Sequence, residues 1–122
     1  MTNALNWFEI PASDIERAKK FYNTIFEVEL IPMEASSGFP MVMFPAERGD
    51  ISGAVIQGEG YKPSVEGSIV YLNGGDDLNT VLNRIEAAGG RVVMPKTDIG
   101  ENGFVAYFMD SEGNKVGLHS MG

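Results

Sequence analysis

The sequence predicts an α+β fold built from two βαβββ units, and two observations support this. An apolar strand, an aspartate and an amphipathic helix occur twice in the same order, with Asp14 and Asp77 at equivalent places half a chain apart. Three further strand-like segments then follow each helix. Duplication of one unit is the economical explanation for this order. We therefore expect one unit over residues 1–62 and a second over residues 63–122.

The first unit opens with an apolar strand over residues 7–10 and continues into a helix over residues 15–26. Ser13 is expected to cap this helix while Glu16 reaches back toward it, which is the reciprocal pairing of a capping box. Apolar residues recur in the helix at spacings of three and four, which predicts one buried face. The strands that follow are expected at 28–33, 41–44 and 53–57.

The second unit repeats the pattern with a strand over residues 69–72 and a helix over residues 78–88. Asp77 is expected to cap this helix. Gly89 and Gly90 then provide the left-handed backbone that commonly ends a helix. The last strands are expected at 91–94, 104–109 and 115–119.

Composition excludes several classes of protein. The 122 residues are 43% hydrophobic, which is enough for one well-packed core. There is no cysteine, so disulfides, thiolate metal sites and cysteine nucleophiles are excluded. A net charge of −8 with dispersed basic residues argues against nucleic acid as a partner. No segment has the composition of a membrane span or a secretion signal, so we expect a cytoplasmic protein with no membrane partner.

Alternation along the strands assigns each side chain either to a helix or to a cleft between the two units. The residues expected beneath the helices are Phe8, Ile10, Ala54, Ile56, Ile69, Tyr71, Val116 and Leu118. The residues expected to face the cleft are Trp7, Glu9, Gly53, Val55, Gln57, Ser68, Val70, Leu72, Gly117 and His119. The predicted cleft is mostly apolar, and its candidate ligand-binding residues are Trp7, Gln57, Ser68 and Val70.

Several short runs carry a family resemblance that extends over nearly the whole chain. They are WFEIP at 7–11, Asp14 followed by RAKKFY at 17–22, AAGG at 87–90 and DSEGNKVGLHS at 110–120. In this order they resemble the vicinal oxygen chelate superfamily, which includes glyoxalase I, bleomycin-resistance proteins and extradiol dioxygenases. The resemblance implies two βαβββ units whose sheets form a half-open, barrel-like cleft with the helices outside. It also implies a homodimer, formed either side by side or by exchange of units.

The resemblance further implies four metal ligands, His or Glu, in the first and last strands of the two units. Matching the motifs puts Trp7, Gly53, Ser68 and Gly117 at these places. None of them offers an imidazole or a carboxylate, the donors that such ions require. We therefore expect no metal ligand and no cofactor. The alternative is a divalent ion such as Zn, Ni, Mn or Fe at shifted positions.

Glu9 and His119 are the candidate catalytic residues. Each stands two residues beyond a vacated ligand place and is expected to face the cleft, where the two side chains could meet. A carboxylate beside an imidazole could serve as a general base and acid. Three hypotheses remain open at this level: a metal-free protein that binds a small organic molecule, a metal-dependent lyase, isomerase or dioxygenase, and a metal-free enzyme using Glu9 and His119. The missing donors favour the first.

Overall fold

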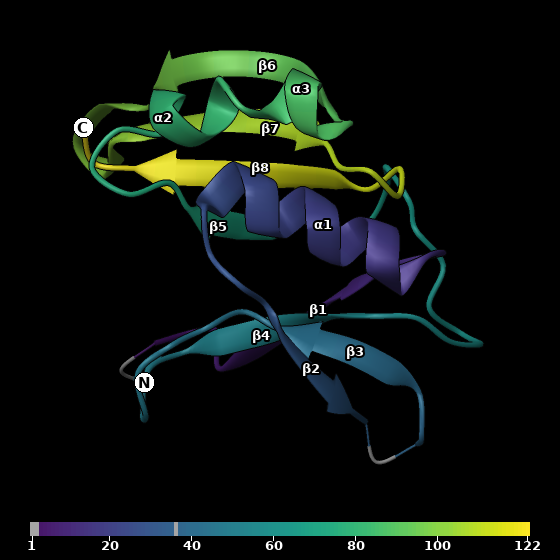
Figure 1. Cartoon of the computed structure of the whole chain (residues 1–122). Coiled ribbons are helices and arrows are strands. Elements are labelled where there is room, and N and C mark those ends of the chain that lie inside the picture. The colour runs from purple at the N-terminus through teal and green to yellow at the C-terminus, as the bar shows by residue number, and fades with distance from the viewer. Residues whose placement is uncertain (1–2, 36) are drawn as a thin grey trace.

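A computed structural model describes residues 3–35 and 37–122, and these residues form two four-stranded sheets (Figure 1). Sheet A has the order β1-β4-β3-β2, and its strands are β1 (Trp7–Pro11), β2 (Ile31–Glu34), β3 (Pro40–Met43) and β4 (Ser52–Ile56). Sheet B has the order β5-β8-β7-β6, and its strands are β5 (Tyr71–Asn73), β6 (Arg91–Asp98), β7 (Phe104–Met109) and β8 (Lys115–Ser120). In both sheets the first strand pairs in parallel with the last. The predicted α+β class is confirmed.

Helix α1 (Ile15–Phe26) has the predicted bounds, but its cap differs from the prediction. Asp14 is the capping residue, and its carboxylate accepts a hydrogen bond from the Arg17 amide at 3.2 Å. Ser13, which was expected to cap the helix, lies one residue before this cap, and its backbone N–H donates to the carboxylate of Glu112 from the second unit.

The second predicted helix is split into α2 (Asn79–Leu82) and α3 (Ile85–Ala88), and a short 3-10 turn, η1 (Gly100–Asn102), follows β6. Asp77 was expected to cap this helix, but Leu78 stands at the cap position of α2; the Asp77 carboxylate accepts a hydrogen bond from the Asn79 amide at 3.0 Å. Gly89 ends α3 with a φ of 108°, which is the left-handed region expected there. Asparagine and threonine are weak helix formers, and their frequency in this segment is consistent with the interruption.

Helix α1 lies between the two sheets, α2 and α3 lie beside it against sheet B, and residues of both units form one core (Figure 1). Helix α1 packs on β3 and β4 of sheet A and also contacts α2 and α3, which pack on β6. Phe21 faces Phe108 of sheet B at a ring separation of 6.0 Å, whereas Tyr22 faces Phe44 beside sheet A at 5.4 Å. Because α1 is apolar toward both units, the helices fill the space where a cleft was expected within one chain. Each sheet therefore has a second face turned away from the helices, here called its outward face.

Two strands have the opposite facing from the one predicted. Val55 and Gly53 lie beside Ile10 and Phe8 on the helix side of sheet A, so Ala54 belongs to the outward face. In β5, Leu72 is buried in the core, and Tyr71 points outward. A one-residue shift in strand phase reverses every side chain, which explains why whole strands are affected.

Among residues 3–35 and 37–122, none of the helices has both the length and the apolar composition needed to span a membrane.

Candidate functional site

The outward face of sheet A is largely apolar. Trp7 leads this face from β1, and the register adds Ile31 and Met33 from β2 beside Met41 and Met43 of β3. Trp7 is 43% exposed, and Ile31 and Met33 are similarly exposed. Methionines adapt their shape readily, and tryptophan offers a large flat surface. This face can therefore pack against a planar apolar molecule.

Glu9 lies beside Trp7 on β1, and its Oε2 atom accepts a long hydrogen bond of 3.4 Å from the Trp7 indole. It also lines a pocket of about 170 Å³ together with Ser68, Val70 and Lys115. The structure thus brings together three of the predicted residues: Glu9, Ser68 and Val70. Val70 also packs against the helix-side core, so its expected place in an open cleft was wrong in part.

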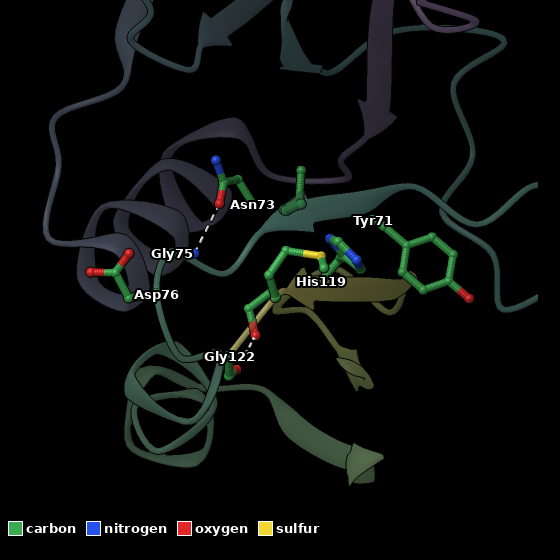
Figure 2. A pocket seen from close by; sticks show the side chains of 9 residues that line it. Tyr71, Asn73, Gly75, Asp76, His119 and Gly122 are labelled. Atoms are coloured by element: carbon green, nitrogen blue, oxygen red, sulfur yellow. Dashed lines mark hydrogen bonds between the residues drawn. The ribbon is translucent and has the colours of Figure 1, made fainter. Parts of the chain in front are cut away.

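His119 lies on the outward face of sheet B and lines a different, larger hollow of about 660 Å³ with Tyr71, Asn73 and Asp76 (Figure 2). Its Nε2 atom is 2.6 Å from the carbonyl oxygen of Asn102. A carbonyl only accepts hydrogen bonds, so Nε2 carries the proton. Glu9 and His119 therefore have separate partners and line separate pockets, and the contact expected between them is not formed within one chain.

Gln57 does not face an open cleft, as had been expected. Its Oε1 atom accepts a hydrogen bond of 2.8 Å from the backbone N–H of Ile15, the first residue of α1. The first N–H groups of a helix have no partner within the helix, so a side-chain acceptor there stabilises its start. Gln57 is consequently a structural residue of the first unit.

The sequence reasoning missed a pair of tyrosines on the two strands that flank β8 in sheet B. Tyr71 of β5 and Tyr107 of β7 both pair with Gly117 of β8, which lies between them. Their hydroxyl oxygens are 2.6 Å apart. A methyl group on Gly117 would come within 2.5 Å of the Tyr71 ring, so the glycine allows this ring to lean across β8. A glycine inside a strand often marks such a close approach, and it was the available signal.

The environment of Tyr71 keeps its hydroxyl protonated. The hydrogen bond with Tyr107, and then partial burial, raise the pKa of Tyr71 to about 12. The Lys115 ammonium lies 4.5 Å from the centre of the Tyr107 ring, in a cation–π contact. Tyr71 therefore offers a neutral hydroxyl at physiological pH, and a positive charge lies against its partner ring.

The residues at the expected metal-ligand places do not fit a divalent ion. The register sets Trp7 beside Ser52 and Tyr71 beside Gly117. None of these four residues has a carboxylate or imidazole donor. Across residues 3–35 and 37–122, no three His, Cys, Asp or Glu side chains gather closely enough to hold a metal.

A buried cluster of polar residues forms hydrogen bonds between the two units. Glu112, in the turn between β7 and β8, accepts hydrogen bonds from the amides of Ser13 and Asp14 at 2.9 and 2.8 Å. It also receives two hydrogen bonds from Arg17, at 2.7 and 3.0 Å. Burial alone would raise the pKa of Glu112, but these hydrogen bonds outweigh it and lower the pKa.

A second buried contact supports the same junction. The hydroxyl of Tyr22 donates to the carboxylate of Asp110 at 2.7 Å. Burial, followed by the charge of Asp110, raises the pKa of Tyr22 far above its ordinary value. The turn from Asp110 to Asn114, part of the family-like run, is therefore accounted for by the assembly of the two units.

Comparison with known proteins adds sequence and structural relatives. The family model of the Glyoxalase/Bleomycin resistance protein/Dioxygenase superfamily matches residues 4–118. CFP32 of Mycobacterium bovis, named as a glyoxylase, is 29% identical over 126 residues, which cover 93% of this chain and 44% of that protein. The chain thus spans less than half the length of this relative.

Solved structures share the fold at low sequence identity. A glyoxalase/bleomycin resistance protein from Albidiferax ferrireducens is similar with a TM-score of 0.71 and 18% identity, covering 95% of this chain and 98% of that one. Glyoxalase I from Zea mays is similar with a TM-score of 0.69 and 17% identity, covering 95% of this chain and 44% of that one.

Proposed function

Because this chain belongs to the glyoxalase/bleomycin resistance protein/dioxygenase superfamily, we propose that it binds a small planar organic molecule on its outward sheet faces without a metal ion. The observation that carries this proposal is the strand register. It puts exposed aromatic residues at two of the places where the family resemblance expects metal donors: Trp7 occupies one such place, and Tyr71 lies beside Gly117, which occupies another. Flat aromatic side chains bind planar ligands by stacking, whereas they cannot replace a carboxylate or an imidazole toward an ion.

We propose that a second copy of the chain completes the site. Each outward face can cover a ligand on one side only, whereas a binding site usually encloses most of the ligand surface. Sheet A offers exposed apolar residues such as Ile31 and Met33, and sheet B offers aromatic and polar ones. An exposed apolar sheet face of this kind usually marks an interface. The wild-type protein is therefore expected to sediment as a homodimer, with sheet A of one copy facing sheet B of the other.

The lengths of the relatives agree with this arrangement. This chain covers 44% of CFP32 and 44% of the maize glyoxalase I chain. Both proteins are long enough to include two segments of this size within one polypeptide. A dimer of the present chain would likewise contain two segments of this size.

The same pairing supports a second candidate function, proton transfer on a carbonyl compound. It would bring Glu9 of one copy toward the face that carries His119 in the other. A carboxylate and an imidazole across a partly apolar site are suited to acid–base catalysis. An isomerase or lyase activity that is lost in Glu9→Gln while ligand binding persists would favour this candidate over binding alone.

Truncation of Trp7 is expected to weaken the binding of planar molecules about tenfold or more, because stacking on an aromatic side chain is worth on the order of 1–3 kcal/mol. Trp7 is the only tryptophan of the chain, so its fluorescence reports directly on ligands that reach sheet A. Titrations with 2-naphthol and 4-nitrophenol, followed by calorimetry, would compare the wild type with Trp7→Ala.

The matched control is Ile99→Ala, which removes another exposed apolar side chain, 44% accessible, away from sheet A. It should leave both affinities within about twofold of the wild type. Equal binding by Trp7→Ala and the wild type would contradict the proposed role of this face.

A further inference from the structure

The tyrosine pair on sheet B has a specific hydrogen-bonding capacity. Each phenol has one O–H donor, and its oxygen can also accept. At 2.6 Å, one hydroxyl of Tyr71 and Tyr107 must donate to the other. The hydroxyl that accepts still has its own hydrogen available for a further acceptor. Accepting a hydrogen bond polarises this second O–H and makes it a stronger donor.

The position of the pair makes this donor accessible. Tyr71 is 43% exposed, and the two rings form a tilted pair with centroids 5.8 Å apart. The Tyr71 ring lies over Gly117, because a methyl group on this glycine would come within 2.5 Å of the ring. A flat molecule lying against the exposed Tyr71 ring would therefore meet aromatic surface and a hydroxyl donor at the same place.

Charge near the pair favours an electron-rich oxygen. The ammonium of Lys115 lies over the Tyr107 ring, as described above, and Lys115 belongs to the same strand as Gly117. Lys115 also lines the small pocket that contains the carboxylates of Glu9 and Glu66. A polarised neutral donor supported by one cation is suited to a single anionic oxygen.

We propose that the hydroxyl pair of Tyr71 and Tyr107 binds the anionic oxygen of the ligand, and that the ligand class is a planar molecule bearing a phenolate or enolate oxygen. This inference rests on the proposed binding of planar molecules to the outward faces and adds the chemical group that is recognised. In the proton-transfer candidate, the same pair would stabilise the enolate formed when a proton leaves the carbon beside a carbonyl.

The test compares two probes that differ in one oxygen. 4-Nitrophenolate carries the anionic oxygen, and nitrobenzene has the same nitro-substituted ring without it. Calorimetric titrations would be made at a pH where the phenol is ionised. Tyr71→Phe keeps the ring and removes the hydroxyl. This variant should lower the affinity for 4-nitrophenolate about tenfold or more, which is the effect expected from losing a hydrogen bond to a charged group. It should change the affinity for nitrobenzene by less than about twofold.

Two further variants separate the hydroxyl pair from general damage. Gly117→Ala keeps both hydroxyls but places a methyl group against the Tyr71 ring, so it should also weaken the phenolate selectively. Tyr61→Phe removes a hydroxyl from a half-buried tyrosine at a separate hollow beside Gln57, and should leave both affinities unchanged. Circular dichroism would verify that each variant is folded.

The outcomes distinguish this inference from the function on which it rests. If Tyr71→Phe and Gly117→Ala lose affinity for 4-nitrophenolate but not for nitrobenzene, the inference is supported. If both probes bind the wild type and Tyr71→Phe weakens them equally or not at all, the pair does not recognise the oxygen, while the proposed binding function stands. If neither probe binds the wild type, both proposals are overturned.

Discussion

Phe21→Ala is expected to lower the free energy of unfolding by about 3–5 kcal/mol, the range measured for large aromatic truncations in cores. Phe21 is 1% exposed and lies where the two units meet. Its ring is 5.0 Å from that of Tyr22 and 6.0 Å from that of Phe108. Because α1 belongs to the first unit and Phe108 to the second, removal of the ring leaves a cavity in the core that both share. Chemical denaturation would measure the loss.

The shared core also predicts the form of the transition. Wild type and variant should each unfold in one cooperative step, since neither sheet keeps its covering when the helices separate. Phe21→Leu retains most of the side-chain volume and should lower the free energy of unfolding by less than about 1.5 kcal/mol. Two separate transitions, or a loss below about 1 kcal/mol in Phe21→Ala, would contradict a core common to both units.

Glu112→Ala is expected to destabilise the protein by about 3 kcal/mol, because it removes charge-assisted hydrogen bonds from a buried junction. The side chain of Glu112 is fully buried and binds two amides at the start of α1. Arg17 is about half exposed and remains hydrated in the variant, which keeps the cost from being larger. Glu101→Ala, at an exposed carboxylate of η1, is the control and should change stability by less than about 0.5 kcal/mol.

The sign of the pH effect follows from the lowered pKa of Glu112 in the folded protein. The group contributes stability above its unfolded pKa of about 4.3, and this contribution is lost as the pH falls through the lower folded pKa. The difference in stability between wild type and Glu112→Gln should therefore shrink as the pH falls below about 4. A difference that stays constant from neutral to acidic pH would show that the charge of Glu112 does not stabilise the junction.

Local signals in the sequence were sufficient for much of the fold. Helix α1 was predicted with its observed bounds, since its apolar spacing is regular. The duplication also predicted two similar units, and the structure shows one four-stranded sheet in each. Capping was predicted less well, because the Glu112 carboxylate that binds the amides of Ser13 and Asp14 comes from 98 or more residues away.

The errors in the candidate site have one physical cause. Strand β5 contains three residues, and Ile69, Val70, Tyr71 and Leu72 are all apolar enough to be placed on either face. Choosing Ile69 and Tyr71 as the buried pair hid the tyrosine that faces outward. In sheet A the same ambiguity exchanged Ala54 with Val55. Pairing register, which depends on distant strands, resolves what alternation within one strand leaves undecided.

The packing of the helices could not be read from either unit alone. A face of α1 that buries Phe21 and Tyr22 is compatible with one sheet or with two. The contacts of Phe21 with Phe108 and of Tyr22 with Asp110 show that it serves both units. For this reason Glu9 and His119 were expected to meet within one chain. Their meeting across two copies stays a prediction, and the sedimentation experiment on the wild type tests it.

Calorimetric titration of chelator-treated protein with Mn²⁺, Ni²⁺, Zn²⁺ and Fe²⁺ tests most directly whether aromatic faces have replaced a metal centre. The register of Trp7 with Ser52, and of Tyr71 with Gly117, predicts no stoichiometric tight uptake of any of these ions, whereas planar probes still bind in the presence of chelator. Tight binding of one ion per chain, lost in Glu9→Gln or in a variant of His119, would contradict this and show a metal site at shifted positions.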